Sequence, residues 1–137
     1  MSVKYHKLKR IIVVNSINEE RFVPKMQLEA PVGFEQIAEM IEKKSTMSRG
    51  DIMGVLAELE VTTCYMLENG HPVTLGLMGT FYPAIEAESA LKPEDVTSRL
   101  IKRFRILFKP STYLKRRLKN VNFVLGDNTV RQVRSRK

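Results

Sequence analysis

The pattern of apolar and polar positions changes period several times along the chain, and each change marks a predicted element. Two β-prone stretches, 3–14 and 21–28, are separated by polar residues that favour a turn, so we expect a β-hairpin. Pro31-Val32-Gly33 then interrupts the extended pattern. Apolar residues next recur at the spacing of one helical face, which predicts a helix over residues 34–44.

A second helix has both a start signal and a stop signal. Ser48 precedes Asp51 by three positions, as in a capping box, where each side chain accepts a hydrogen bond from the other residue's backbone N–H. Asn69-Gly70 supplies the left-handed residue that commonly ends a helix. The helix is therefore predicted over residues 49–69. Its apolar stripe consists of Ile52, Val55, Leu56, Leu59, Thr63, Met66 and Leu67.

After the second helix the period changes to two, which predicts strands. A strand over 73–77 is followed by a tight connection at 78–80 and a return strand over 81–87. Pro83 removes one ladder hydrogen bond from the return strand and favours a sheet edge or a bulge there. We expect residues 88–99 to leave the sheet as an excursion.

A third strand is predicted over residues 100–108, and its two faces differ in chemistry. Side chains alternate between the two faces of a strand. Phe104 and Phe108 are therefore expected to point inward, while Arg103 and Arg105 emerge on the opposite face.

The end of the chain combines a short helix with a basic tail. Pro110-Ser111 opens the helix, which directs two leucines inward and basic side chains outward. Residues 121–123 allow a short further strand. Residues 126–137 are polar and basic, so we expect a disordered tail there.

The charge of the chain is distributed unevenly. The whole sequence has 23 Lys and Arg against 15 Asp and Glu, a formal net charge of +8. Residues 90–137 hold 14 basic and 3 acidic side chains, a net +11, whereas residues 1–89 hold 9 basic and 12 acidic side chains, a net −3. Such asymmetry favours a polyanionic partner, because basic side chains near phosphates release condensed counterions. A generic solubilising surface is the alternative interpretation.

The same sequence argues against several classes of function. No stretch approaches the roughly 20 apolar residues of a membrane span, and the run 11–14 is too short for a signal-peptide core. His6, His71 and Cys64 lie in separate elements without motif spacing, and no glycine-rich phosphate loop is present. We therefore expect a protein that neither spans a membrane nor is exported. We also expect no enzyme activity, bound metal, cofactor or small-molecule substrate. The single cysteine cannot form an internal disulfide, which is typical of a reducing cytosol.

The order of predicted elements, two helices, three strands and a helix, resembles the HU and integration host factor family of bacterial nucleoid proteins. Residues 34–81 are similar to the family's first two helices and first hairpin, including Leu-Glu-Asn-Gly at 67–70 and Gly-Thr-Phe at 79–81. Phe108-Lys109-Pro110, followed by Leu114-Lys115, is similar to the segment that leads into the family's last helix. The extra N-terminal hairpin resembles that of the extended HU-like DNA-binding proteins of Bacteroidetes.

The resemblance covers residues 34–120 and implies an α+β fold built as an intertwined homodimer. It implies two N-terminal helices, a three-stranded antiparallel sheet with a modified arm, and a C-terminal helix. The predicted domains are the hairpin at 1–30, an HU-like DNA-binding domain at 31–125 and the disordered basic tail at 126–137. A lone three-stranded sheet shields aromatic rings poorly, and burial of one such ring is worth about 1.5–3 kcal/mol. The predicted dimer core is Phe81, Phe104 and Phe108, with monomeric packing under the N-terminal hairpin as the alternative.

The excursion departs from the family pattern. The family's arm carries several arginines and an Arg-Asn-Pro tip whose proline wedges between base pairs. Here Pro93 precedes Glu94 and Asp95, a combination that favours the start of a helical turn over a wedge. Ser111 and Thr112 also stand where the family commonly has glycine and often has a basic residue. We therefore expect DNA binding without strong bending by the arm.

The resemblance implies duplex DNA binding without sequence preference, by a nucleoid-associated architectural protein of the bacterial cytoplasm that condenses DNA. Arg103 and Arg105 are the leading candidates, because the family presents that sheet face to DNA, although solvated strand residues are an alternative. Glu86 and Glu88 would repel phosphate on the same face, and the sequence offers no account of them. An HU-like dimer repurposed as a structural or protein-interaction module is the alternative function. The candidate DNA-binding residues are Lys102, Arg103, Arg105, Lys109, Lys115, Arg116, Arg117 and Lys119.

Overall fold

The computed structural model describes residues 2–133, which form three α-helices and two three-stranded sheets, an α+β fold. The chain divides into two compact units. Unit 1 combines Met1–Pro31 with Leu118–Lys137, and unit 2 is Val32–Arg117. Each unit contains one of the two sheets.

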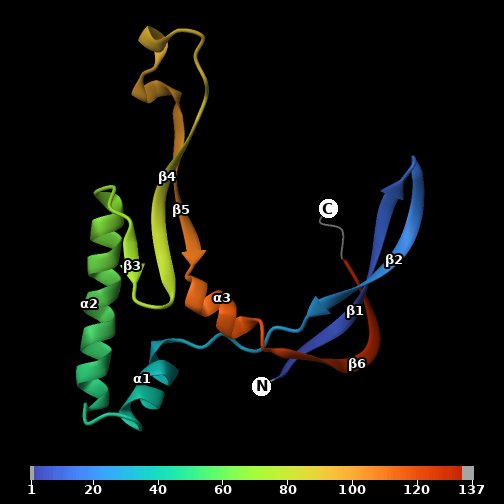
Figure 1. Ribbon diagram of the computed structural model, residues 1–137, viewed down its shortest axis with the longest axis horizontal. Helices are drawn as coiled ribbons and strands as arrows, with labels where there is room; N and C mark the ends of the chain where they lie inside the picture. The colour runs from blue at the N-terminus through green and yellow to red at the C-terminus, as the bar shows by residue number, and fades with distance from the viewer. Residues whose placement is uncertain (1, 134–137) are drawn as a thin grey trace. The chain divides into compact units, whose positions relative to one another are not determined.

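Unit 1 is built on the predicted N-terminal hairpin. Strand β1 spans Ser2–Val14 and pairs antiparallel with β2, which spans Ile17–Met26 (Figure 1). The turn is shorter than predicted, because only Asn15 and Ser16 separate the strands. Both have positive φ angles, 50° and 65°. This conformation suits a two-residue hairpin turn, whose twist matches that of the strands it joins.

The third strand of unit 1 corrects the prediction of a disordered tail from residue 126. Strand β6 spans Asn122–Gln132 and pairs in parallel with β1, so the sheet order is β2-β1-β6. Its register shifts between Leu125, opposite Tyr5, and Val130, opposite Lys7. The intervening residues form an irregularity in the ladder, where the Thr129 backbone N–H donates to the Asp127 carboxylate at 2.9 Å. Residues 134–137 of the predicted tail lie outside the described residues.

The strand β6 also changes the domain organisation. The prediction assigned residues 118–125 to an HU-like domain ending at 125, whereas the structure places them in unit 1. The physical reason is backbone pairing, since Asn122 to Leu125 form their ladder with Ser2 to Tyr5. The N-terminal hairpin and β6 therefore form one sheet, although they lie at opposite ends of the described sequence.

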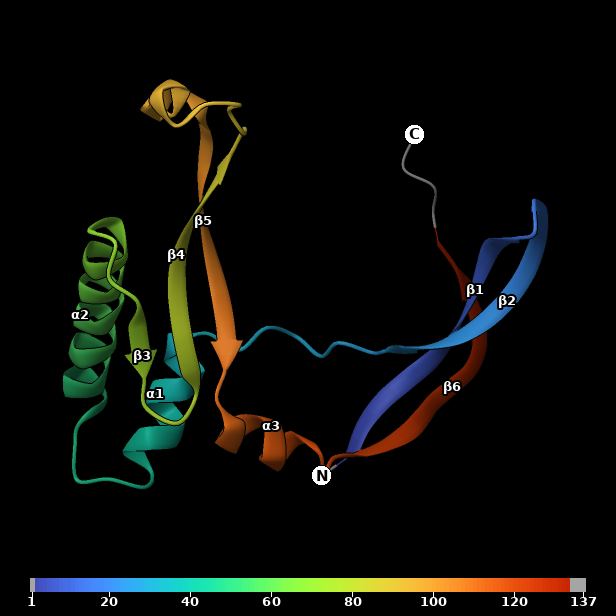
Figure 2. The same cartoon turned by 45° about the horizontal axis from the view of Figure 1, so that its top comes forward.

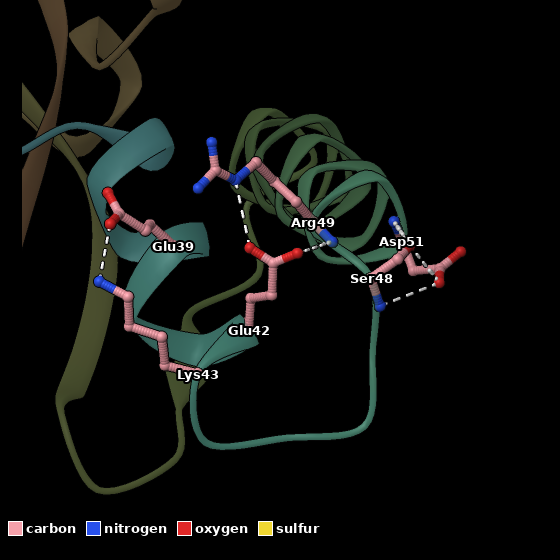
Figure 3. Close-up of polar contacts among 6 residues, drawn as sticks. All are labelled: Glu39, Glu42, Lys43, Ser48, Arg49 and Asp51. Carbon is pink, nitrogen blue, oxygen red and sulfur yellow. Dashed lines mark hydrogen bonds and ion pairs between the residues drawn. The ribbon is translucent and has the colours of Figure 1, made fainter.

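Unit 2 begins with the two predicted helices, α1 at Phe34–Glu42 and α2 at Arg49–Glu68. The capping box at the start of α2 is confirmed: the Asp51 backbone N–H donates to Ser48 Oγ at 3.2 Å, and the Ser48 backbone N–H donates to Asp51 Oδ2 at 3.3 Å (Figure 3). The helices contact each other. Glu42 ties them together, because its carboxylate accepts from the Arg49 backbone N–H and pairs with the Arg49 guanidinium at 3.4 Å.

One further ion pair lies at this corner. Lys43 Nζ donates to Glu39 Oε1 at 2.7 Å, one helical turn away (Figure 3). The hydrogen bond from Lys43, and to a lesser degree the positive charges of Lys43 and Arg49, lower the pKa of the Glu39 carboxyl. The pair therefore favours the ionised form of the Glu39 carboxyl.

The sheet of unit 2 has the order β3-β4-β5, with antiparallel neighbours (Figure 1). Strand β3 spans Val73–Leu75, β4 spans Gly79–Ala87 and β5 spans Ile101–Pro110. Helix α2 contacts β3 and β4. Because β3 pairs only with Gly79 to Phe81, Pro83 lies where β4 has one neighbour, which agrees with the expected edge position.

The excursion between β4 and β5 folds into two short 3₁₀ turns at the far end of the hairpin (Figure 2). The first spans Pro93–Asp95 with proline at its start, as the sequence predicted. The second spans Ser98–Leu100 and leads directly into β5.

Helix α3 spans Thr112–Leu118 and is anchored to the sheet by Ser111. The Ser111 hydroxyl accepts from the Leu114 backbone N–H at 3.0 Å and donates to the Leu77 carbonyl. The Ser111 backbone N–H also donates to the Met78 carbonyl at 3.0 Å. Serine at this position therefore caps the helix and joins it to the turn between β3 and β4.

The apolar core within one chain is small. Among residues 2–133, the buried apolar side chains are Leu8, Ala38, Ile52 and Leu67. The predicted apolar stripe of α2 is covered only in part, since Val55 is 58% exposed and Leu59 is 41% exposed.

Gly79 provides a test of the fold of unit 2. Its φ is +151°, and a Cβ atom there would contact the Lys109 carbonyl and lie 2.9 Å from the Phe108 ring. We expect Gly79→Ala to lower the free energy of unfolding by roughly 1–3 kcal/mol, as overpacking does. Urea unfolding at equal protein concentrations measures this change.

The matched control is Gly50→Ala in the first turn of α2. A Cβ there meets Ser48 Oγ at 3.8 Å, an ordinary contact, and alanine is the better helix former. We expect this variant to be at least as stable as the wild type. Equal stability of both variants would contradict the close packing of β4 against β5.

Candidate functional site

The register of β4 against β5 separates two chemically different faces of the hairpin. Phe81 lies opposite Phe108, and Ile85 lies opposite Phe104. Because side chains alternate along each strand, these four residues share one face. Four residues of β5 lie on the other face: Arg103, Arg105, Leu107 and Lys109. The predicted alternation of β5 is thus confirmed from Arg103 onward, and the structure places three candidate DNA-binding residues on one face.

Glu86 lies on the same face as the two arginines and contacts both. It is the register partner of Arg103, whose Nε donates to Glu86 Oε2 at 2.5 Å. Arg105 Nη1 lies 3.9 Å from the same oxygen. One carboxylate therefore faces two guanidinium groups, and the net charge of this cluster is +1.

Two other basic residues of β5 have neighbours of different kinds. Lys102 occupies the point where the register shifts, between the pairs Glu86–Arg103 and Ala87–Ile101. Its Nζ pairs with Glu88 at 3.2 Å. Lys109 Nζ lies 4.8 Å from the centre of the Tyr82 ring, within the range of a cation–π contact.

The remaining candidates lie on or after α3. Lys115, Arg116 and Arg117 are exposed and consecutive, so they point in different directions around the helix. Arg117 Nη1 donates to the Tyr113 hydroxyl at 3.4 Å. Lys119 follows the helix and belongs to unit 1.

The three phenylalanines predicted to form a dimer core lie on the apolar face of the hairpin. Phe81 and Phe108 contact each other, with ring centroids 5.0 Å apart and an angle of 42° between the rings. Phe104 is nevertheless 53% exposed and Phe108 47% exposed. Ile85 and Ile106, on the same face, are also exposed. Together these residues form an exposed apolar strip, which we define as Ile85, Phe104, Ile106 and Phe108.

Other kinds of site find little support in residues 2–133. No group of three or more His, Cys, Asp or Glu side chains there could hold a metal ion. His6 is buried in β1, Cys64 is exposed on α2, and His71 precedes β3. Within the same range, no helix has the length and apolar character needed to cross a membrane.

Comparison with known families accounts for this arrangement of elements. The family model HU-HIG, described as an HU domain fused to a wHTH, Ig or glycine-rich motif, matches residues 1–124. The chain belongs to the HU-HIG family. The match confirms the predicted resemblance to HU, and it includes the N-terminal hairpin of unit 1 as well as the whole of unit 2.

A solved structure supports the same fold. It is the crystal structure of a protein from Bacteroides vulgatus ATCC 8482 that is described as a presumed bacterial DNA-binding protein. The two chains are 14% identical and superpose with a TM-score of 0.58 over 98% of this HU-HIG chain. The chain spans about half the length of that protein, 51%. No curated protein matches the sequence.

The sequence did not reveal the role of Glu86 and Glu88 beside the basic residues. The pattern of alternation assigns residues to faces within one strand, but it does not set the register across an excursion of a dozen residues. Only the observed pairing of Glu86 with Arg103 brings these charges together. The excess of acidic residues at the end of β4 was the available signal.

Proposed function

We propose that this HU-HIG chain binds duplex DNA without sequence preference, as an architectural protein of the bacterial nucleoid. The observation that carries the proposal is the separation of faces on the β4–β5 hairpin, basic on one side and apolar on the other. The family and the description of the structural neighbour support the same class of partner.

The chemistry of the basic face suits a phosphate backbone. Arg103 and Arg105 present planar guanidinium groups. Each such group can donate two parallel hydrogen bonds to the oxygens of one phosphate. Lys109 and the basic residues of α3 extend the positive charge toward one end of β5 (Figure 1). Such contacts position a protein on DNA without selecting a sequence.

We further propose that two chains associate through the exposed apolar strip. Its four residues lie on the hairpin face opposite the arginines, so pairing there would leave the basic face accessible. Burying one such phenylalanine is worth about 1.5–3 kcal/mol. A homodimer of this kind accounts for the small core of the single chain.

The second candidate function is a structural or protein-interaction module of the same fold. The ion pairs of Glu86 with the arginines and of Glu88 with Lys102 favour it, because they neutralise part of the charge that DNA binding would use. A gel shift with unrelated duplexes separates the two functions: shifts of similar strength with each duplex support DNA binding, and their absence supports the module.

The dimer is tested by sedimentation equilibrium. We expect a homodimer at micromolar concentration and a weaker one for Phe104→Ser, because each symmetric dimer would lose two buried rings. Leu91→Ser is the control, since Leu91 is fully exposed in the excursion and lies outside the strip. A wild-type monomer, or equal association of both variants, would contradict the proposed interface.

The basic face is tested by replacing both arginines. We expect Arg103→Ala with Arg105→Ala to weaken binding similarly for unrelated duplexes and to flatten the dependence of affinity on salt. The control is Lys4→Ala with Lys25→Ala, which removes the same charge from unit 1. If the two double variants lose the same affinity in a fluorescence titration, total charge and not this face governs binding.

DNA bending is tested by energy transfer on a short duplex labelled at both ends. We expect less bending than a protein with a wedging arm produces, because unstacking a base step costs a few kcal/mol and Pro93 begins a 3₁₀ turn beside Glu94 and Asp95. Pro93→Ala should therefore leave the end-to-end distance unchanged. Strong bending that disappears in this variant would identify Pro93 as a wedge.

A further inference from the structure

We propose that Glu86 is a built-in competitor of the DNA phosphates, which holds the affinity of the basic face below what its arginines could provide. This inference rests on the proposed function and deepens it, because it names the residue that sets the strength of binding. It assigns a role to an acidic side chain on a surface that would otherwise be expected to carry only positive charge.

The geometry places one carboxylate oxygen against both arginines. Glu86 Oε2 accepts from Arg103 Nε at 2.5 Å and lies 3.9 Å from Arg105 Nη1. Arg103 lies directly opposite Glu86 in the register, and Arg105 lies on the diagonal. Direct and diagonal neighbours on one face are the pairs whose side chains reach each other across antiparallel strands. The contact is therefore fixed by the pairing of β4 with β5.

The carboxylate uses the same donors that a phosphate would use. A guanidinium recognises carboxylate and phosphate groups with similar geometry, through N–H donors arranged as a fork. A phosphate approaching this face must displace Glu86 from Arg103 or share the donors with it. In either case the cluster of Glu86, Arg103 and Arg105 has a net charge of +1, whereas the two arginines without Glu86 would have a charge of +2.

Glu86 and Glu88 differ in the number of basic side chains that they contact. Among residues 2–133, Glu88 pairs only with Lys102, at 3.2 Å, and both side chains are more than half exposed. Exposed single pairs of this kind contribute little, because water and salt screen them. The Glu86 side chain is 40% exposed, against 62% for Glu88, and it faces two guanidinium groups, those of Arg103 (66% exposed) and Arg105 (44% exposed). It is therefore the stronger competitor of the two.

The first test compares the DNA affinity of Glu86→Gln with that of the wild type across a range of salt concentrations. If one more phosphate is neutralised per chain, the slope of log affinity against log salt becomes steeper by about 0.9 for each chain, and by about 1.8 for the proposed homodimer. Between 1 M and 0.1 M salt, the affinity of the variant relative to that of the wild type then rises by about eightfold for each chain. Glutamine keeps the size of the side chain and its hydrogen-bonding capacity, and thermal unfolding verifies that the variant is folded.

Two controls separate local competition from a general change in charge. Glu58→Gln removes the same charge from an exposed position on α2, and it should leave the slope nearly unchanged. Glu86→Gln added to Arg103→Ala and Arg105→Ala should gain almost nothing, because the carboxylate then has no arginine to release. A Glu86→Ser variant repeats the test if the glutamine variant unfolds.

The relative affinities of these variants show whether Glu86 competes with the DNA phosphates. A gain for Glu86→Gln that exceeds that of Glu58→Gln and vanishes without the arginines supports competition at this face. Equal gains for both glutamine variants, or no gain for either, overturn it while leaving DNA binding by the wild type intact. Binding by Glu86→Gln alone, without measurable binding by the wild type, also supports competition. If neither protein binds any duplex, the proposed function itself fails.

Discussion

The antiparallel register between β4 and β5 is the constraint on which the rest of unit 2 depends. Side chains alternate with a period of two, so the pair Phe81–Phe108 determines the face of each residue of the hairpin as far as the register shift at Lys102. A slip by one residue would bring arginines to the apolar face and phenylalanines to the basic one. The close approach of Gly79 to Phe108 opposes such a slip, because only a residue without Cβ fits there. The apolar strip and the basic face are therefore two results of one pairing.

This constraint links assembly to function. The residues that make one face apolar remain about half exposed in the single chain, and α2 also exposes Val55 and Leu59. A soluble protein seldom leaves contiguous apolar surface uncovered unless a partner covers it. Since the proposed partner is a second copy, burial of the strip would present two basic faces together. The affinity for a polyanion would then depend on assembly even though no charged residue lies on the strip.

The sequence revealed elements whose signals are local, and it failed where the structure depends on distant pairing. The sequence predicted both ends of α2 correctly, from the capping box of Ser48 with Asp51 and from the stop signal Asn69-Gly70. Such capping signals act within one turn of helix. Alternation likewise identified the faces of β5. Only the start of β6 was predicted, as a short strand at 121–123; the rest was missed because its partner, β1, lies more than 100 residues away and its own pattern is interrupted by Gly126-Asp127-Asn128. Of the candidate site, the strand arginines came together on one face, whereas Lys119 fell in the other unit.

The distribution of charge in the fold differs from the distribution along the chain. The net +11 of residues 90–137 suggests a strongly positive C-terminal third, but Glu86 and Glu88, which precede it, lie against Arg103 and Lys102. The end of the hairpin nearer the excursion is thus almost balanced. Within residues 2–133, no ion pair involves Lys109 or the basic residues of α3, at the other end of β5 (Figure 1). Long-range attraction depends on uncompensated charge. Under the proposed function, a polyanion would therefore meet unit 2 first near α3 and reach the arginines only afterwards, where Glu86 would compete with it.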